Sequence, residues 1–152
     1  MTPRRSTRRS ILATLGLGLA LALAPRAAHA DVAYEPPPRL AVRASVPNYT
    51  TAPTSVVLSV TNTTSAAIVT QGVRLIVLTG GVRVPLRVTG VQVDGRPTGV
   101  WSDITFAPGA RVQLRIDFDE VPATALAVGH IDFALRLGHT AESTFSMARA
   151  GR

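Results

Sequence analysis

Hydrophobic and polar residues alternate along most of the chain from residue 39 onward. Alternation with a period of two is typical of strands that bury one face. The alternating segments begin near residues 40, 56, 73, 82, 101, 112, 131 and 143, and Gly, Pro, Asn or Asp residues separate them. Outside the N-terminal segment, no window of about 11 residues has the helical period. The pattern predicts an all-β domain.

The clearest predicted element is a hairpin around Gly80-Gly81. Two glycines supply the positive φ angles that a two-residue primed turn requires. Beyond Val88 the apolar positions change parity, and Gly90 marks the place where a β-bulge is expected. The residue pairs expected from this turn are Thr79–Val82, Val77–Val84, Leu75–Leu86 and Val73–Val88.

The first 30 residues differ in kind from the rest. A basic start is followed by a 14-residue apolar run, Ile11 to Ala24, and by the small-x-small motif of Ala28 and Ala30. These are the three parts of a secretory signal, predicted to be helical and to be cleaved after Ala30. The apolar run is too short for a membrane-spanning helix, which needs about 20 residues. We therefore expect no stable membrane anchor after cleavage.

The segment Thr7-Arg8-Arg9-Ser10-Ile11-Leu12 resembles the twin-arginine export motif, with Ala13 in place of the usual lysine. The resemblance implies that Arg8 and Arg9 address the chain to the twin-arginine translocase, and that the mature protein is periplasmic or secreted. General secretory export is the alternative. The predicted organisation is a signal peptide (1–30), a Pro-rich leader (31–38), a β-sandwich domain (39–148) and a frayed tail (149–152).

Removal of the signal changes the charge of the protein. The whole chain carries +7, but the 122 residues after Ala30 hold 11 arginines and nine acidic residues, a net charge of +2 with no lysine. This charge is too small and too scattered for the basic stripe of a nucleic-acid-binding protein. The chain has no cysteine, which excludes disulfides, thiol chemistry and a lipoprotein anchor.

Seven or eight short antiparallel strands, with turns about every 10 residues, are typical of a sandwich of two sheets. A closed barrel is the alternative. The segments Leu58-Ser-Val-Thr-Asn-Thr-Thr-Ser65 and Phe106-Ala-Pro-Gly-Ala-Arg-Val-Gln-Leu114 are similar to those of exported bacterial immunoglobulin-like domains. The resemblance implies an immunoglobulin-like sandwich of the adhesion-related or accessory kind. It implies no active site.

Candidate metal ligands are few. His130 and Asp132 share one face of a predicted strand, but most metal sites need three or four ligands. Cleavage after Ala28 would instead expose His29 as an amino-terminal copper ligand, with His130 and His139 as further candidates. A calcium loop around the sequence Asp117-Phe-Asp-Glu120 is a further alternative, but calcium takes six to eight oxygens, and acidic residues on a solvated edge are the favoured interpretation. We therefore predict no metal and no cofactor.

No Gly-x-Ser-x-Gly motif or recognisable Ser-His-Asp spacing indicates catalysis. Tyr34, Tyr49 and Trp101 could form an exposed platform for a sugar or a partner, although the position of Trp101 beside Ile104 and Phe106 favours the core. The function expected from the sequence is a non-enzymatic binding, structural or assembly module that contacts a protein or another envelope component. The alternatives are a periplasmic copper carrier and a hydrolase.

Overall fold

The computed structural model describes residues 35–151. The predicted export signal, with Arg8, Arg9, Ala28 and Ala30, lies outside these residues. The described part is all-β, as the alternating pattern predicts. Its elements are β1 (Leu40–Ala44), β2 (Asn48–Tyr49), β3 (Ser55–Asn62), β4 (Ile68–Gln71), β5 (Val73–Thr79), β6 (Val82–Leu86), β7 (Val88–Val93), β8 (Arg96–Thr98), β9 (Asp103–Phe106), β10 (Arg111–Phe118), α1 (Ala123–Leu126), β11 (His130–Leu137) and β12 (Ser143–Arg149).

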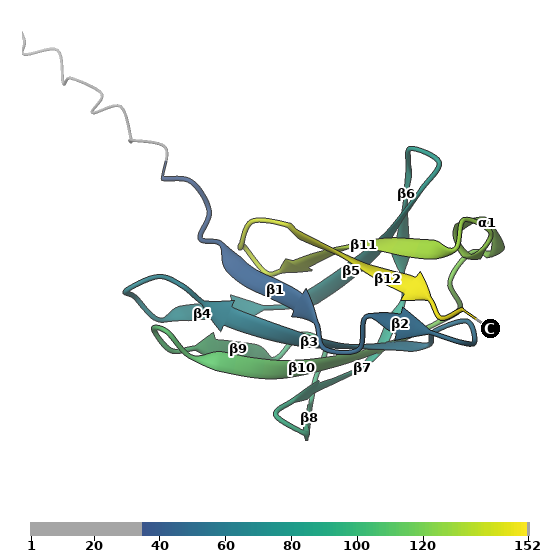
Figure 1. Cartoon of the computed structure of the whole chain (residues 1–152). Coiled ribbons are helices and arrows are strands. Elements are labelled where there is room, and N and C mark those ends of the chain that lie inside the picture. Colours follow the sequence, from purple (N-terminus) through teal and green to yellow (C-terminus); the bar gives the residue numbers. More distant parts are fainter. Residues whose placement is uncertain (1–34, 152) are drawn as a thin grey trace, which may run out of the picture. The chain divides into compact units, whose positions relative to one another are not determined.

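The strands form two five-stranded sheets and a two-stranded ribbon (Figure 1). The first sheet has the order β1-β3-β10-β7-β8, and the second has the order β2-β12-β11-β5-β6. The strands β4 and β9 pair with each other. Among the described strands, β2 and β12 are the only parallel neighbours.

The core lies between the two sheets. In β10, Val112, Leu114, Ile116 and Phe118 are buried while the residues between them face outward. Three aromatic rings continue this core from the first sheet into the second. The ring centroids of Phe118 and Phe133 are 6.1 Å apart, and those of Phe133 and Phe145 are 5.1 Å apart. Burial of such alternating apolar side chains is the main stabilising term, because no cysteine is present to crosslink the sheets.

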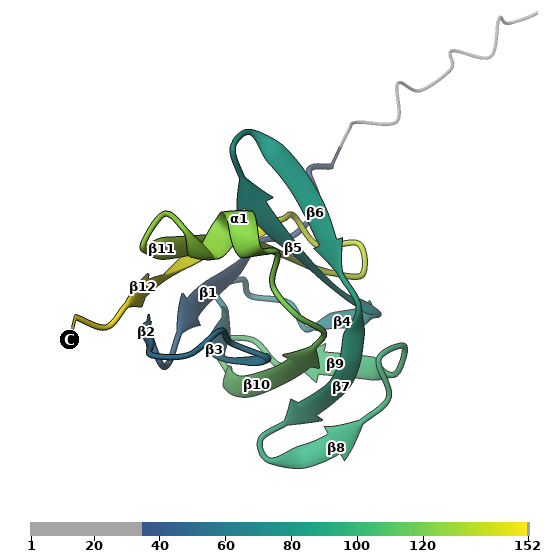
Figure 2. The same ribbon diagram turned by 90° about the vertical axis from the view of Figure 1, so that its right-hand side faces the viewer.

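The hairpin around Gly80-Gly81 confirms three of the four expected pairs and corrects the fourth. Thr79, Val77 and Leu75 lie opposite Val82, Val84 and Leu86. Val73 does not lie opposite Val88, however, because the chain leaves the second sheet after Leu86 and enters the first sheet as β7 (Figure 2).

An irregular pairing of β7 with β10 explains the parity shift near Gly90. Val88 lies opposite Phe118 and Gly90 lies opposite Asp117, so that Thr89 is the extra residue of an irregular pairing. The expected irregularity is therefore present, one residue before Gly90.

Short elements account for the remaining differences from the sequence predictions. Among residues 35–151 twelve strands are present rather than the seven or eight expected, and eight of them have five residues or more. The short β2, β4 and β8 have two to four residues each, too few to produce a clear alternation in the sequence. The single turn of α1 is too short to produce a periodic pattern. Among residues 35–151 no helix has the length and apolar character needed to cross a membrane.

The C-terminal strand is longer than the pattern indicates. Pairing of β12 with β2 includes Ala148 and Arg149, and the backbone N–H of Ala150 donates to the carbonyl of Tyr49 over 2.8 Å. The backbone is thus hydrogen-bonded beyond Ala148, where fraying was expected.

A buried amide joins three parts of the chain. Asn62, at the end of β3, is 0% exposed. Its Nδ2 donates to the carbonyls of Ala66 and Phe106 at 2.8 and 2.9 Å, and its Oδ1 accepts from the backbone N–H of Thr64 at 2.9 Å. Its backbone also pairs with the turn at residues 107–110, through the N–H of Gly109 and the carbonyl of Ala110. The Asn62 side chain therefore fixes the β4–β9 ribbon to the first sheet.

Replacing both Gly80 and Gly81 by valine should lower the free energy of unfolding by about 1–3 kcal/mol for each strained site. Both glycines have positive φ, 54° and 79°. No atom lies within 4 Å of a Cβ built at either position, so the loss would come from the backbone alone. Denaturant unfolding measures the loss. The double asparagine variant is the control because asparagine tolerates positive φ, and equal stability of the valine and asparagine variants would contradict the turn geometry.

The substitution Asn62→Asp should lower the free energy of unfolding by about 3–5 kcal/mol, because a carboxylate cannot donate to the carbonyls of Ala66 and Phe106, the second of which is buried, and would bring an unpaired charge into the core. The exposed neighbour Thr63→Ala serves as control. Denaturant unfolding of both variants provides the measurement. A loss below about 1 kcal/mol in Asn62→Asp would show that the amide does not hold this region together.

Candidate binding surface around Trp101

Trp101, the single tryptophan of the chain, is 64% exposed. The prediction that it belongs to the core is wrong. Its neighbours Ile104 and Phe106 are buried as expected, but β9 begins only at Asp103, so their alternation does not extend to the indole. Trp101 lies instead in a turn that precedes the strand.

Hydrogen bonds fix the position of this turn. The N–H of Ser102 donates to the carbonyl of Gly99 over 3.0 Å, and the N–H of Gly99 donates to Oγ of Ser102 over 3.1 Å. The N–H of Val73 donates to the carbonyl of Val100 over 3.1 Å, which attaches the turn to the first residue of β5. An exposed ring on an anchored backbone loses little entropy when it binds a partner.

Gly72 leaves the space that the indole of Trp101 occupies. A Cβ at this position would lie 2.7 Å from Cε3 and Cζ3 of Trp101, closer than any side chain allows. Gly72 also has a φ of 86°, which favours glycine. The ring therefore lies directly against the backbone just before β5, and one of its sides stays open to solvent.

An apolar groove of about 630 Å³ adjoins Trp101. Its lining residues come from β5, from the segment where the chain passes from β6 to β7, and from the turn before β9. Its apolar lining includes Val73, Ile76, Pro85, Leu86, Val88 and Val100. Exposed apolar surface beside an aromatic side chain is typical of places where partners bind.

A smaller hollow of about 220 Å³ adjoins Trp101 and is polar in character. Arg74 of β5 and Arg136 of β11 lie directly opposite each other in the second sheet, and both line this hollow together with Gln71. Within residues 35–151 no carboxylate lies in ion-pair range of either arginine. Trp101 and Arg74 line both the groove and the hollow, so the two form one continuous surface, here called the Trp101 surface.

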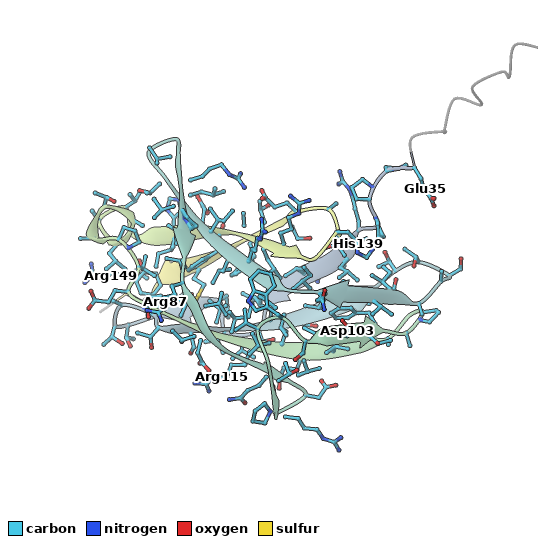
Figure 3. The ribbon with its side chains drawn as sticks, turned by 180° about the vertical axis from the view of Figure 1, so that it is seen from behind. Glu35, Arg87, Asp103, Arg115, His139 and Arg149 are labelled. Carbon is cyan, nitrogen blue, oxygen red and sulfur yellow. The ribbon has the colours of Figure 1, made fainter. Side chains whose placement is uncertain are left out.

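The histidines proposed as metal ligands do not come together. His130 Nε2 lies 3.4 Å from Asp132 Oδ2 at the start of β11, and Ser146 donates to the other oxygen of Asp132. His139 follows the far end of the same strand, at the end of the molecule that carries Glu35 and away from Arg149 (Figure 3).

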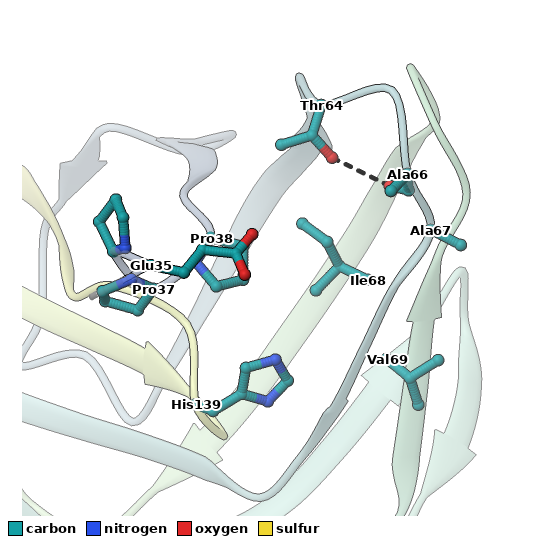
Figure 4. Close-up of a pocket in the computed structure, with 10 residues that line it drawn as sticks. Glu35, Pro37, Pro38, Thr64, Ala66, Ala67, Ile68, Val69 and His139 are labelled. Carbon is teal, nitrogen blue, oxygen red and sulfur yellow. Dashed lines mark hydrogen bonds between the residues drawn. The ribbon is translucent and has the colours of Figure 1, made fainter. Parts of the chain in front are cut away.

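His139 lines a separate open hollow with Pro37, Pro38, Ile68 and Val69 (Figure 4). The other lining residues that Figure 4 shows supply no second imidazole to this hollow. Within the described part of the chain, no group of three His, Asp or Glu residues has the geometry of a metal site.

The acidic segment after β10 is arranged around a buried ring. Phe118 is buried, as predicted, while Asp117 Oδ1 accepts from Nε of Arg115 at 3.0 Å. The backbone N–H of Asp119 donates to the carbonyl of Arg87. Asp117 is therefore engaged by an arginine, which opposes a calcium ion at this place.

No family model, characterised protein or solved structure matches this chain. The candidate surface consequently stands on its geometry alone.

Sequence reasoning did not find the basic half of the Trp101 surface. Arg74 and Arg136 look like ordinary outward-facing strand residues, and only the pairing of β5 with β11 places them side by side. Tyr49, considered for an exposed platform, is buried, and its hydroxyl has no hydrogen-bond partner within the described residues. Tyr34 lies outside those residues.

The fluorescence of Trp101 should change little in emission maximum when the protein unfolds, and acrylamide should quench it efficiently in the folded state, because the ring is already mostly in water. A second variant, Gly72→Ala, should displace the ring. It should also lower the free energy of unfolding by about 1–3 kcal/mol, since alanine is strained at this φ. A strongly blue-shifted, poorly quenched emission from the folded protein would contradict the exposed position.

Proposed function

We propose that this chain is an exported immunoglobulin-like module that binds a protein or another envelope component through the Trp101 surface and performs no chemistry itself. The observation that carries the proposal is the combination found at Trp101. A large amphipathic ring is open to solvent, anchored by three hydrogen bonds of its turn, and bordered by an apolar groove. Such rings are the residues that most often dominate binding energy in interfaces.

The strand order supports the immunoglobulin-like assignment. In that fold, strands A, B, E and D form one sheet and strands C, F and G form the other. Strands A to G correspond in chain order to β1, β3, β5, β7, β10, β11 and β12. The first sheet then has the order A-B-E-D and the second contains G-F-C, as in the immunoglobulin fold. The chain departs from antibody domains in having no cysteine pair and no buried tryptophan in β5.

Export rests on the N-terminal sequence. Arg8 and Arg9 precede an apolar run that ends at a cleavage motif formed by Ala28 and Ala30. A domain without cysteine needs no oxidising compartment to fold, and a twin-arginine substrate folds before it crosses the membrane. The absence of disulfides therefore agrees with this route, which would place the Trp101 surface outside the cytoplasm.

A photoactivatable phenylalanine at Gln71, which lines the hollow beside Trp101, should crosslink the protein to a discrete partner in the exported fraction of the native host. The same residue at Ala41, exposed on β1 in the other sheet, is the matched control and should give no such adduct. Adding Trp101→Ala to the Gln71 variant should abolish the adduct. Mass spectrometry identifies the partner, and an adduct that persists without the indole, or forms equally from Ala41, would contradict the proposal.

A further inference from the structure

Two like charges are held next to each other on the Trp101 surface. Arg74 and Arg136 are direct cross-strand neighbours, and both are exposed. Like charges in this position repel each other and lower the stability of a sheet. The repulsion would be relieved if an anion bound between them.

Other charged groups near the second sheet do not compensate these arginines. Asp132 is engaged by His130 and Ser146, and Glu142 forms an ion pair with Arg83. Asp103 lies opposite Gln71 in the β4–β9 ribbon but lines a different hollow with Val93 and Thr98. The positive charge beside Trp101 is therefore available to a ligand.

The apolar groove and the basic hollow together indicate the chemistry of that ligand. Resting on the proposed function, we infer that the Trp101 surface binds an extended segment of a partner protein in which apolar side chains are followed closely by carboxylates. The apolar side chains occupy the groove beside Val73, Pro85 and Val100, with the indole as one wall. The carboxylates then lie in the hollow, where the guanidinium groups of Arg74 and Arg136 donate to them.

A peptide fits these features better than an acidic sugar does. A sugar ring could stack on the exposed indole and place a carboxylate near the arginines. Its hydroxyl groups would find few hydrogen-bond partners in the groove, however, because that groove is lined mainly by Val, Leu, Ile and Pro side chains. Peptide side chains of Leu or Val match this lining, so the observations favour a protein segment.

The test uses three blocked peptides of equal length with the exported protein. The first contains Leu-Leu-Asp-Asp, the second Leu-Leu-Asn-Asn and the third Gly-Gly-Asp-Asp, each flanked by glycine. Fluorescence of Trp101, the single tryptophan of the chain, reports binding directly. The first peptide should bind with a Kd on the order of 100 μM, and the other two at least about tenfold more weakly. Raising the salt from about 50 to 500 mM should weaken only the binding of acidic peptides.

Variants separate charge recognition from folding. Arg74→Gln and Arg136→Gln should each weaken binding of the Leu-Leu-Asp-Asp peptide about tenfold, a typical loss for a charge-assisted hydrogen bond. Neither should change binding of the Leu-Leu-Asn-Asn peptide. Both variants should melt at or above the wild-type temperature, because each relieves the repulsion. Arg43→Gln, exposed on β1, is the matched control and should bind like the wild type.

Each contrary result has a distinct meaning. Equal binding of the Asp and Asn peptides would overturn the acidic specificity and leave the proposed Trp101 interface standing. No binding of any peptide up to several millimolar would overturn the inference, while the crosslinking experiment decides the proposed function separately. Arginine-dependent binding of a uronic acid disaccharide in place of the peptide would assign the surface to acidic sugars and overturn the peptide ligand.

Discussion

The amide of Asn62 is the hydrogen-bonding group on which the arrangement of the candidate surface depends. It donates to one carbonyl in the loop after β3 and to another at the end of β9, segments that are 40 residues apart in sequence. A buried carbonyl without a donor is costly, so the Phe106 carbonyl holds the end of β9 against the amide, and the part-buried bond to Ala66 attaches the loop before β4 to the same group. The β4–β9 ribbon is thereby fixed to the first sheet, although it pairs with neither five-stranded sheet.

The position of Trp101 follows from that attachment. The indole lies two residues before the start of β9, and its turn also bonds to the first residue of β5 in the second sheet. The ribbon is thus attached to the first sheet by Asn62, and the turn that precedes β9 is attached to the second sheet by the carbonyl of Val100. A flexible loop would let an exposed indole collapse onto nearby apolar surface. A turn fixed at both ends keeps it open, with Gly72 leaving room for the ring on one side.

Local patterns predicted the long strands because each has one buried face, and they predicted the register of the β5–β6 hairpin because a two-residue turn allows few alternatives. They failed where non-local contacts decide. Val88 continues the alternation of β6, yet it belongs to β7 of the other sheet. Asn62 and Phe106 each lie in a segment that resembles immunoglobulin-like domains, but the hydrogen bond that joins the two segments depends on the fold. The site was predicted least well, since its arginines meet through pairing across 62 positions of sequence.

The contrast between the two faces of the second sheet separates stability from function. Its inner face is filled by apolar side chains such as Leu75, Phe133 and Leu135, which any sandwich of this size requires. Stability does not require a pair of facing arginines on the outer face, nor an indole seated on a glycine with positive φ. The facing arginines oppose folding to a small extent because like charges repel, and they border the same hollow as the indole. A locally unfavourable charge pair beside an exposed aromatic ring is an arrangement that folding alone does not explain, which is why this face is the candidate site.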